Sequence, residues 1–263
     1  MISDGQNRGE AVELIRSLPP SRIKPRWVRS SGNQALLESC LRFAETPTQI
    51  EPRAMLVEGC DGSGLSSLLL ELERRLLGSG QRVISLLEGR GSDERYLLSN
   101  LTSVIRVPVQ IKNPKKLSFI TESVLQLRCI KVLIVHDFQR FIFLGKTETN
   151  ANIEAITYLS RLLPECKIIL GGSKDSLDHF RSVVSNLDVE YVALQAMRFD
   201  QNFVRYVHDV LGTLPEKNTV NLVDPKILHV MTGGLVGETF TQLHVLVACQ
   251  ASQSAFCKAS RNE

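Results

Sequence analysis

The sequence predicts an α/β domain in which helices cover both faces of a parallel sheet, followed by a smaller helical region. A glycine-rich turn over residues 59–66 joins a short apolar segment to a leucine-rich one. Short apolar runs then alternate with longer amphipathic segments, which is the pattern of strand–helix–strand units. From Asp200 onward the pattern is helical only. We therefore expect an N-terminal arm and helix over 1–45, an α/β core over 46–198 and a helical lid over 199–263.

The composition is that of a globular protein that does not enter a membrane. With 263 residues, the chain can bury one good core with a small appendage. Hydrophobic residues make up 43% and charged residues 22%, and no apolar run approaches the ~18 residues of a membrane span. The first residues lack the layout of a signal peptide, and the six cysteines form no Cys-x-x-Cys pair. We expect reduced thiols, a cytoplasmic location and no membrane partner.

A net charge of only +3 argues against nucleic-acid binding by the whole surface. Two local clusters are more basic, because residues 22–29 carry four cations in eight positions and residues 112–116 carry three in five. Each cluster is either a phosphate-binding surface or a solvated segment, and composition alone leaves both interpretations open.

Five apolar runs predict the strands of the sheet. They cover residues 55–57, 82–87, 131–137, 167–172 and 191–194. The run that begins at 131 is continuously apolar until its polar end, as expected of a parallel strand that is buried on both faces.

Amphipathic segments before and between these runs predict the helices. A short helix over 10–18 ends at two prolines, and a second helix covers 33–44. The leucine-rich helix over 66–77 ends at a Gly-Ser-Gly turn. The next helix covers 92–105 and carries acids in its first turn, where the helix dipole favours them. Further helices are expected over 117–127, 152–163, 203–211, 225–231 and 238–250.

The turn that begins at Gly59 has the spacing of a phosphate-binding loop, Gly-x-x-x-x-Gly-x-Ser. Such a loop wraps an anion with backbone N–H groups, and the helix that follows adds partial positive charge. Leu65 occupies the position of the phosphate-binding lysine, and losing a charge-assisted contact of ~1.5–3 kcal/mol would weaken nucleotide binding about ten- to hundredfold. The candidate nucleotide-binding residues are Gly59, Asp61, Gly62, Gly64, Ser66 and Ser67.

A second part of a nucleotide site would follow the apolar segment over 132–135, where acids normally hold Mg²⁺ and orient the attacking water. His136 and Asp137 stand there. Histidine is a poor ligand for a hard cation, so Asp137 remains as the candidate catalytic acid. Ser173 follows the next strand and either senses the γ-phosphate or caps the following helix.

These residues predict ATP and Mg²⁺ as cofactors whose binding is weakened by Leu65 and His136. Two altered positions in one site indicate that hydrolysis is very slow or lost. Elsewhere the histidines and cysteines show no metal-ligand spacing, so we predict no metal site. The same residues also fit an α/β domain whose glycine turn binds no nucleotide.

In their order and spacing, the motifs resemble those of the TniB group of AAA+ proteins, relatives of TnsC and of the phage Mu transposition regulator. The resemblance runs from about Ile23 to about Ala251. It implies a P-loop AAA+-like parallel sheet flanked by helices, with a small C-terminal helical lid. It rests on residues 24–26, 93–95, 132–140, 171–175, 192–194 with Arg198, Asp200 and Phe203, and 233–238, the Gly-Leu-x-Gly-Glu turn of the lid.

The resemblance implies a regulator of DNA transposition that binds ATP and duplex DNA. In that family ATP promotes assembly into filaments or rings on DNA, and the assembly recruits the transposase. Lys112, Lys115 and Lys116 would then contact DNA phosphates. A homo-oligomer or co-assembly with an active paralogue is expected, with the transposase and other transposition proteins as partners.

Three positions depart from the family's pattern. Leu65 replaces the phosphate-loop lysine, His136 replaces the magnesium aspartate, and the segment before Val192 lacks the inter-subunit arginine, with Arg181 as the nearest cation. We therefore expect a transposition regulator or target-DNA adaptor with weak or absent ATP hydrolysis. One alternative is a nucleotide-independent module that bridges a transposase and another targeting protein. Another is an active ATPase that recruits a non-standard lysine such as Lys174.

Overall fold

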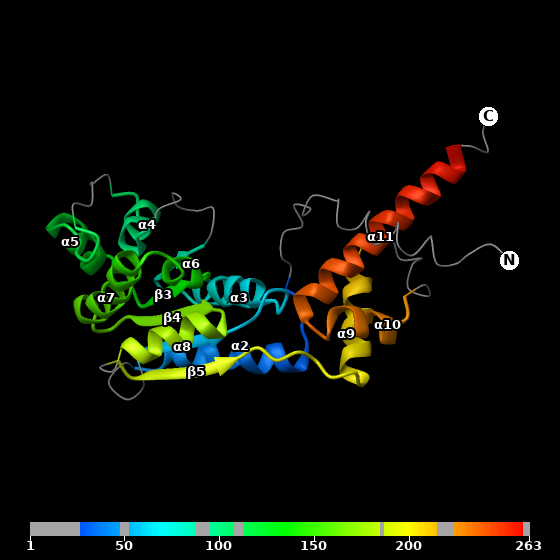
Figure 1. Ribbon diagram of the computed structural model, residues 1–263, viewed down its shortest axis with the longest axis horizontal. Helices are drawn as coiled ribbons and strands as arrows, with labels where there is room; N and C mark the ends of the chain where they lie inside the picture. The colour runs from blue at the N-terminus through cyan, green and yellow to red at the C-terminus, as the bar shows by residue number, and fades with distance from the viewer. Residues whose placement is uncertain are drawn as a thin grey trace.

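Five parallel strands form a single sheet in the computed structural model, which describes residues 27–47, 53–87, 95–107, 113–184, 187–214 and 223–259 (Figure 1). The strands are β1 (Ala54–Glu58), β2 (Val83–Leu86), β3 (Val132–Val135), β4 (Lys167–Gly172) and β5 (Val189–Ala193). Their order is β2-β3-β4-β1-β5, and every pair is parallel. The predicted parallel α/β sheet is confirmed.

Strand β1 lies at the heart of the sheet, with Met55 opposite Ile169 of β4 on one side and Glu190 of β5 on the other. Strands β3 and β4 are buried along their whole length, as expected of parallel strands covered on both faces. Because all five strands run in one direction, the loops that follow β1, β3 and β4 open at one edge of the sheet. This is the edge at which α/β proteins place their ligands.

Helices cover both faces of the sheet, as the sequence predicts. On one face lie α2 (Ser31–Glu45) and α3 (Leu65–Gly78), packed on Val132 and Ile134. The opposite face carries Leu133 and Val135, as the alternation of side chains along a strand requires. It is covered by α4 (Leu97–Val104), α5 (Phe119–Leu127), α6 (Gln139–Ile142), α7 (Lys146–Leu162) and α8 (Lys174–Val183).

A separate apolar cluster holds the three C-terminal helices together. These helices are α9 (Gln201–Thr213), α10 (Pro225–Thr232) and α11 (Val236–Ala259), and they lie at one end of the molecule, where α11 extends away from the sheet (Figure 1). The Asp200 carboxylate caps α9 by accepting from the N–H groups of Phe203 and Asn202, and these bonds hold the pKa of Asp200 below its usual value. Within the described ranges, no helix combines the length and apolar character needed to cross a membrane.

Three helix boundaries differ from the predicted ones by more than two residues. Helix α7 begins at Lys146 rather than at 152. Its first turns are polar and show no apolar periodicity, so the sequence gives no signal for them. The Thr149 hydroxyl anchors this part of the helix by donating to Ile142 O at 2.7 Å. Helix α4 begins at Leu97, with Tyr96 as its N-cap, and the acidic residues Asp93 and Glu94 of the predicted start lie outside the described residues. Helix α11 continues to Ala259. The predicted helix over 10–18 lies outside the described residues.

The buried side chain of Asn152 makes three hydrogen bonds to backbone groups of other segments. Its removal tests how much these bonds contribute to stability. Its Oδ1 accepts from Leu97 N–H at 2.8 Å, and its Nδ2 donates to Arg95 O and Phe141 O, both at 2.9 Å. The side chain is fully buried. Asn152→Ala leaves these backbone groups without partners, so we expect the free energy of unfolding in urea to fall by roughly 2–4 kcal/mol.

The matched control is Glu154→Ala on the same helix, which removes an exposed ion pair with Lys115. Such a pair contributes less than about 1 kcal/mol. Equal losses in the two variants would mean that Asn152 contributes no more than a surface contact.

Candidate functional site

The loop that follows β1 keeps the backbone of a phosphate site. Gly62 and Gly64 have φ angles of +75° and +90°, a left-handed conformation that favours glycine. The backbone N–H groups of Gly62, Gly64, Leu65 and Ser66 are bonded to no acceptor among the described residues. Unbonded N–H groups at a glycine turn and a helix start form a nest for an anion. The loop therefore has a backbone that suits an anion, and its binding of a nucleotide stays a prediction.

Leu65, at the position of the expected lysine, turns into the core. Its side chain is 9% exposed and belongs to the apolar cluster on the α3 face of the sheet. A Cβ on Gly59 would lie 3.3 Å from Leu65 Cδ2, and a Cβ on Gly171 would lie 3.5 Å from Leu65 Cδ1. The leucine thus fills space that two glycines leave open. Leu65 therefore makes apolar packing contacts at the position where a nucleotide site needs a cation.

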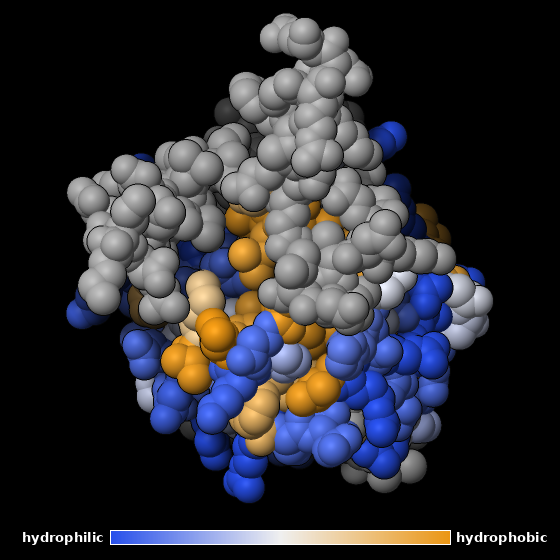
Figure 2. All heavy atoms as spheres, turned by 90° about the vertical axis from the view of Figure 1, so that its right-hand side faces the viewer, coloured by the Kyte–Doolittle hydropathy of each residue, from blue (hydrophilic) through white to orange (hydrophobic). Residues whose placement is uncertain are grey.

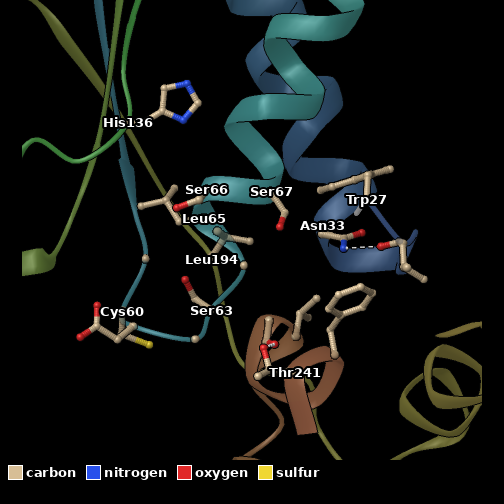
Figure 3. A pocket seen from close by; sticks show the side chains of 18 of the residues that line it. Trp27, Asn33, Cys60, Ser63, Leu65, Ser66, Ser67, His136, Leu194 and Thr241 are labelled. Carbon is tan, nitrogen blue, oxygen red and sulfur yellow. Dashed lines mark hydrogen bonds between the residues drawn. The ribbon is translucent and has the colours of Figure 1, made fainter. Parts of the chain in front are cut away.

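His136 is also held within the protein. Its side chain is 3% exposed, and its Nε2 lies 2.7 Å from Ser85 Oγ on β2. Figure 3 shows the imidazole ring apart from Cys60 and Ser63 of the loop. The residue at the position expected for a magnesium-binding aspartate is therefore hydrogen-bonded to strand β2.

Mg²⁺ does not fit this donor set. Hard cations take carboxylate, carbonyl or water oxygens as ligands, and the carboxylate that follows β3 is Asp137 alone. No group of three His, Cys, Asp or Glu side chains that could hold a metal is found in the described part of the chain. The end of β3 thus supplies one carboxylate and an imidazole that is already hydrogen-bonded.

Ser173 does not line the cavity at the loop. It precedes α8, its N–H donates to Gln139 Oε1 at 3.1 Å and its hydroxyl donates to Ser176 Oγ at 3.3 Å. The hydroxyl makes no capping bond to a backbone N–H of α8. Gln139 and Asp137 do line the cavity. A γ-phosphate contact of Ser173 stays a prediction, and Gln139, unlike Ser173, lines the cavity.

A cavity of about 520 Å³ lies between the loop and the C-terminal helices. It takes in the predicted residues Gly59, Asp61, Gly62, Gly64, Ser66, Ser67 and Asp137. Trp27 and Thr241 border it from opposite sides (Figure 3). Burial raises the pKa of Tyr206, so its hydroxyl stays protonated and donates to Val236 O at 2.9 Å. No lysine or arginine is among the described residues that line this cavity.

The start of α11 rests directly on the loop. The N–H of Glu238 donates to Gly62 O at 2.8 Å. A Cβ on Gly237 would lie 2.8 Å from Gly62 O and 2.9 Å from Gly64 N, so this close approach requires glycine. The turn over 233–238 stands out in the sequence through its family resemblance, and its contact with the loop comes from the structure.

Several residues of the cavity give no signal in the sequence. Trp27 and Phe240 supply an aromatic wall, and Gln139 borders the loop from a short helix. They are scattered along the chain and carry no motif spacing, so their convergence depends on the tertiary fold.

The predicted DNA-binding lysines lie elsewhere. Lys115 Nζ pairs with Glu154 Oε1 at 2.9 Å, and both Lys115 and Lys116 border a second cavity of about 490 Å³ that is also lined by α7 and the end of α8. Helix α5 lies at the end of the molecule away from α11 (Figure 1). Lys112 lies outside the described residues. Lys174, proposed as a substitute cation, is exposed at the start of α8 and does not line the loop cavity.

No protein-family model matches the sequence, and no curated protein matches it either. Among solved structures, domain III of the replication initiation protein DnaA from Thermotoga maritima is similar, with a TM-score of 0.52 and 16% identity over 86% of this chain and 88% of that one. The Walker-type ATPase of Pyrococcus abyssi has a TM-score of 0.45 and 17% identity over 91% of this chain and 80% of that one. The likeness to domain III concerns the fold alone, and it agrees with the predicted parallel sheet flanked by helices, which is confirmed.

Adding one methyl group to α11 tests whether its start rests on the loop. In Gly237→Ala the new Cβ would meet Gly62 O and Gly64 N within 3 Å, so the helix start has to move. We expect faster hydrogen–deuterium exchange of the loop amides, even though alanine favours a helix by about 1 kcal/mol. Gly212→Ala in α9 is the control, because nothing lies within 4 Å of its Cβ. Unchanged loop exchange in Gly237→Ala would contradict the contact.

Proposed function

We propose that this chain is a DNA-binding adaptor on a P-loop AAA+-like fold that regulates transposition and recruits a transposase, with weak or absent ATP hydrolysis. The observation that carries the proposal is the cavity at the loop. It keeps unbonded backbone N–H groups at Gly62 and Gly64 but has no lysine or arginine among its described lining residues. The site thus resembles a nucleotide switch that lacks the groups for phosphate transfer.

Hydrolysis of ATP needs positive charge near the γ-phosphate, and the described residues around the loop supply little of it. Phosphoryl transfer depends on positioning and on cations that stabilise developing negative charge. Leu65 is buried in the core, and His136 is bonded to Ser85. Asp137 remains able to orient a water, but orientation alone leaves the charge of the transition state uncompensated. We infer that ATP is not turned over at a useful rate.

The role in transposition rests on the resemblance of the motifs and their order to the TniB group. Similarity of fold to a domain of a replication initiation protein agrees with a DNA-associated role, by analogy only. Lys112, Lys115 and Lys116 are the proposed DNA contacts, and a homo-oligomer or a mixed assembly with an active paralogue is the proposed state on DNA. The division into an arm over 1–45, a core over 46–198 and a lid over 199–263 is part of the same proposal.

A second candidate function is a nucleotide-independent interaction module. It is favoured by apolar side chains that gather on the lid end of the molecule, which Figure 2 views directly. Val230 on α10 is 78% exposed, and Phe199, Ile227 and Met231 are about half exposed. Such a patch is typical of protein-binding surfaces. In this candidate the partner protein, rather than DNA, decides where the chain acts.

We expect phosphate release from ATP to match that of a sample without protein, with and without duplex DNA, because the cavity lacks a cation for the γ-phosphate. Release above background that Lys174→Ala abolishes would support the active ATPase instead. A release that only Asp137→Asn abolishes would also contradict the proposed loss of hydrolysis.

Replacing the three proposed DNA contacts with alanine tests the DNA-binding role. In the triple variant of Lys112, Lys115 and Lys116, we expect the slope of log K against log salt for duplex DNA to become less steep by up to about 3. Fluorescence anisotropy at several salt concentrations measures this slope. Glu154→Ala is the companion variant, and it should strengthen DNA binding because it frees Lys115. An unchanged slope in the triple variant would show that the DNA contacts lie elsewhere.

A further inference from the structure

We propose that the cavity binds a nucleoside diphosphate without a metal ion and disfavours the triphosphate. This inference rests on the proposed function in one respect, namely that the loop is a nucleotide loop without catalytic cations. It goes further by naming the ligand, by excluding a metal ion from its binding and by reversing the usual preference for ATP.

At the end of the cavity that the loop forms, the hydrogen-bond donors are uncharged. The N–H groups of Gly62, Gly64, Leu65 and Ser66 are unbonded within the described structure. Ser63 adds a hydroxyl that is unbonded among the described residues, although the residue is only 4% exposed. That hydroxyl points into the loop (Figure 3), where a Cβ on Gly59 would lie 2.6 Å from its oxygen. Together these donors suit a phosphate group.

Beyond the loop, the charged side chains that line the cavity within the described structure are carboxylates. Asp61 and Asp137 line the cavity. The Glu238 carboxylate lies beside the loop, since its Oε2 is 3.4 Å from the position of a Cβ on Gly62, and its Oε1 accepts from Gln242 Nε2 at 2.9 Å. A further phosphate would meet carboxylates where a nucleotide switch supplies a lysine. Repulsion between these carboxylates and an added phosphate disfavours the triphosphate.

A metal ion cannot reverse this preference. Mg²⁺ bridges the β- and γ-phosphates only where the protein supplies oxygen ligands. The residue where a nucleotide site places its metal-binding carboxylate is His136, whose imidazole is hydrogen-bonded to Ser85 and is a poor ligand for a hard cation. Binding of the diphosphate should therefore be the same with magnesium and with a chelator.

The other end of the cavity suits a base. Trp27 lines this end of the cavity and is only partly buried, so a flat heteroaromatic ring can stack on it. Trp27 Nε1 is buried and has no acceptor among the described residues, so it can donate to a ring nitrogen. The cavity, at about 520 Å³, lies within the range of roughly 300–1,000 Å³ that small-molecule sites occupy.

Isothermal titration of the full chain with ADP and with ATP, each in magnesium and in EDTA, tests the proposal. We expect ADP to bind with a Kd that changes less than about twofold between magnesium and EDTA, and ATP to bind roughly tenfold more weakly. Tighter binding of magnesium-ATP than of ADP would overturn the proposal. No heat with ADP at millimolar concentration would overturn it equally.

Two variants locate the binding site and keep the test independent of folding. Ser66→Asp places a carboxylate at the nest and should abolish ADP binding, whereas Ser182→Asp on the exposed part of α8 is the matched control with the same added charge. Glu238→Gln removes a charge beside Gly62 and should lower the ratio of the Kd for ATP to the Kd for ADP about threefold or more. Retained ADP binding in Ser66→Asp, or an unchanged ratio in Glu238→Gln, would contradict the proposal.

Failure of this proposal differs from failure of the proposed function. If magnesium-ATP binds best but is not hydrolysed, the ligand proposal falls and the adaptor role stands. If phosphate is released in turnover, the proposed loss of hydrolysis falls, whichever nucleotide binds more tightly. If duplex DNA is not bound while ADP is, the DNA role falls and the ligand proposal stands.

Discussion

The burial of Leu65 at the start of α3 is the constraint on which the chemistry of the site depends. Its side chain packs into space that Gly59 and Gly171 leave open, beside Leu69, whose Cδ1 would lie 2.4 Å from a Cβ on Gly171. Lysine at this position would have to leave that cluster to reach a phosphate. The core therefore gains apolar contact at the one place where a nucleotide site needs a charge.

At the end of β3, too, a residue makes a contact within the protein at a position where a nucleotide site needs a ligand group. The imidazole of His136 is bonded to Ser85 on the neighbouring strand, so a position that would hold a metal contributes instead to the sheet. The start of α11 adds a third contact, because the N–H of Glu238 is bonded to Gly62 O. The loop thus keeps a backbone that suits an anion, while Leu65 and His136 make contacts within the protein. These contacts are the physical basis of the adaptor role that we propose.

The fold could be predicted from the sequence because its signals are local. Continuous apolar runs identify the buried strands, and the glycine spacing identifies the loop after β1. The site could be predicted only in part. Gln139 lies on a four-residue helix with no pattern of its own, and Trp27 and Phe240 meet only in the folded chain. Ser173 sits at the right strand end, but its hydroxyl is directed to Ser176, and strand order alone does not show this.

The measurement that tests this account most directly is the free energy of unfolding of Leu65→Lys, without nucleotide, against Leu65→Met as the control of similar volume. If position 65 serves the core, the lysine variant should lose about 2 kcal/mol or more, because a charged group is buried among apolar side chains. The methionine variant should lose less than about 1.5 kcal/mol. A lysine variant as stable as the wild type would mean that the position is free to serve a phosphate, and the account would be wrong.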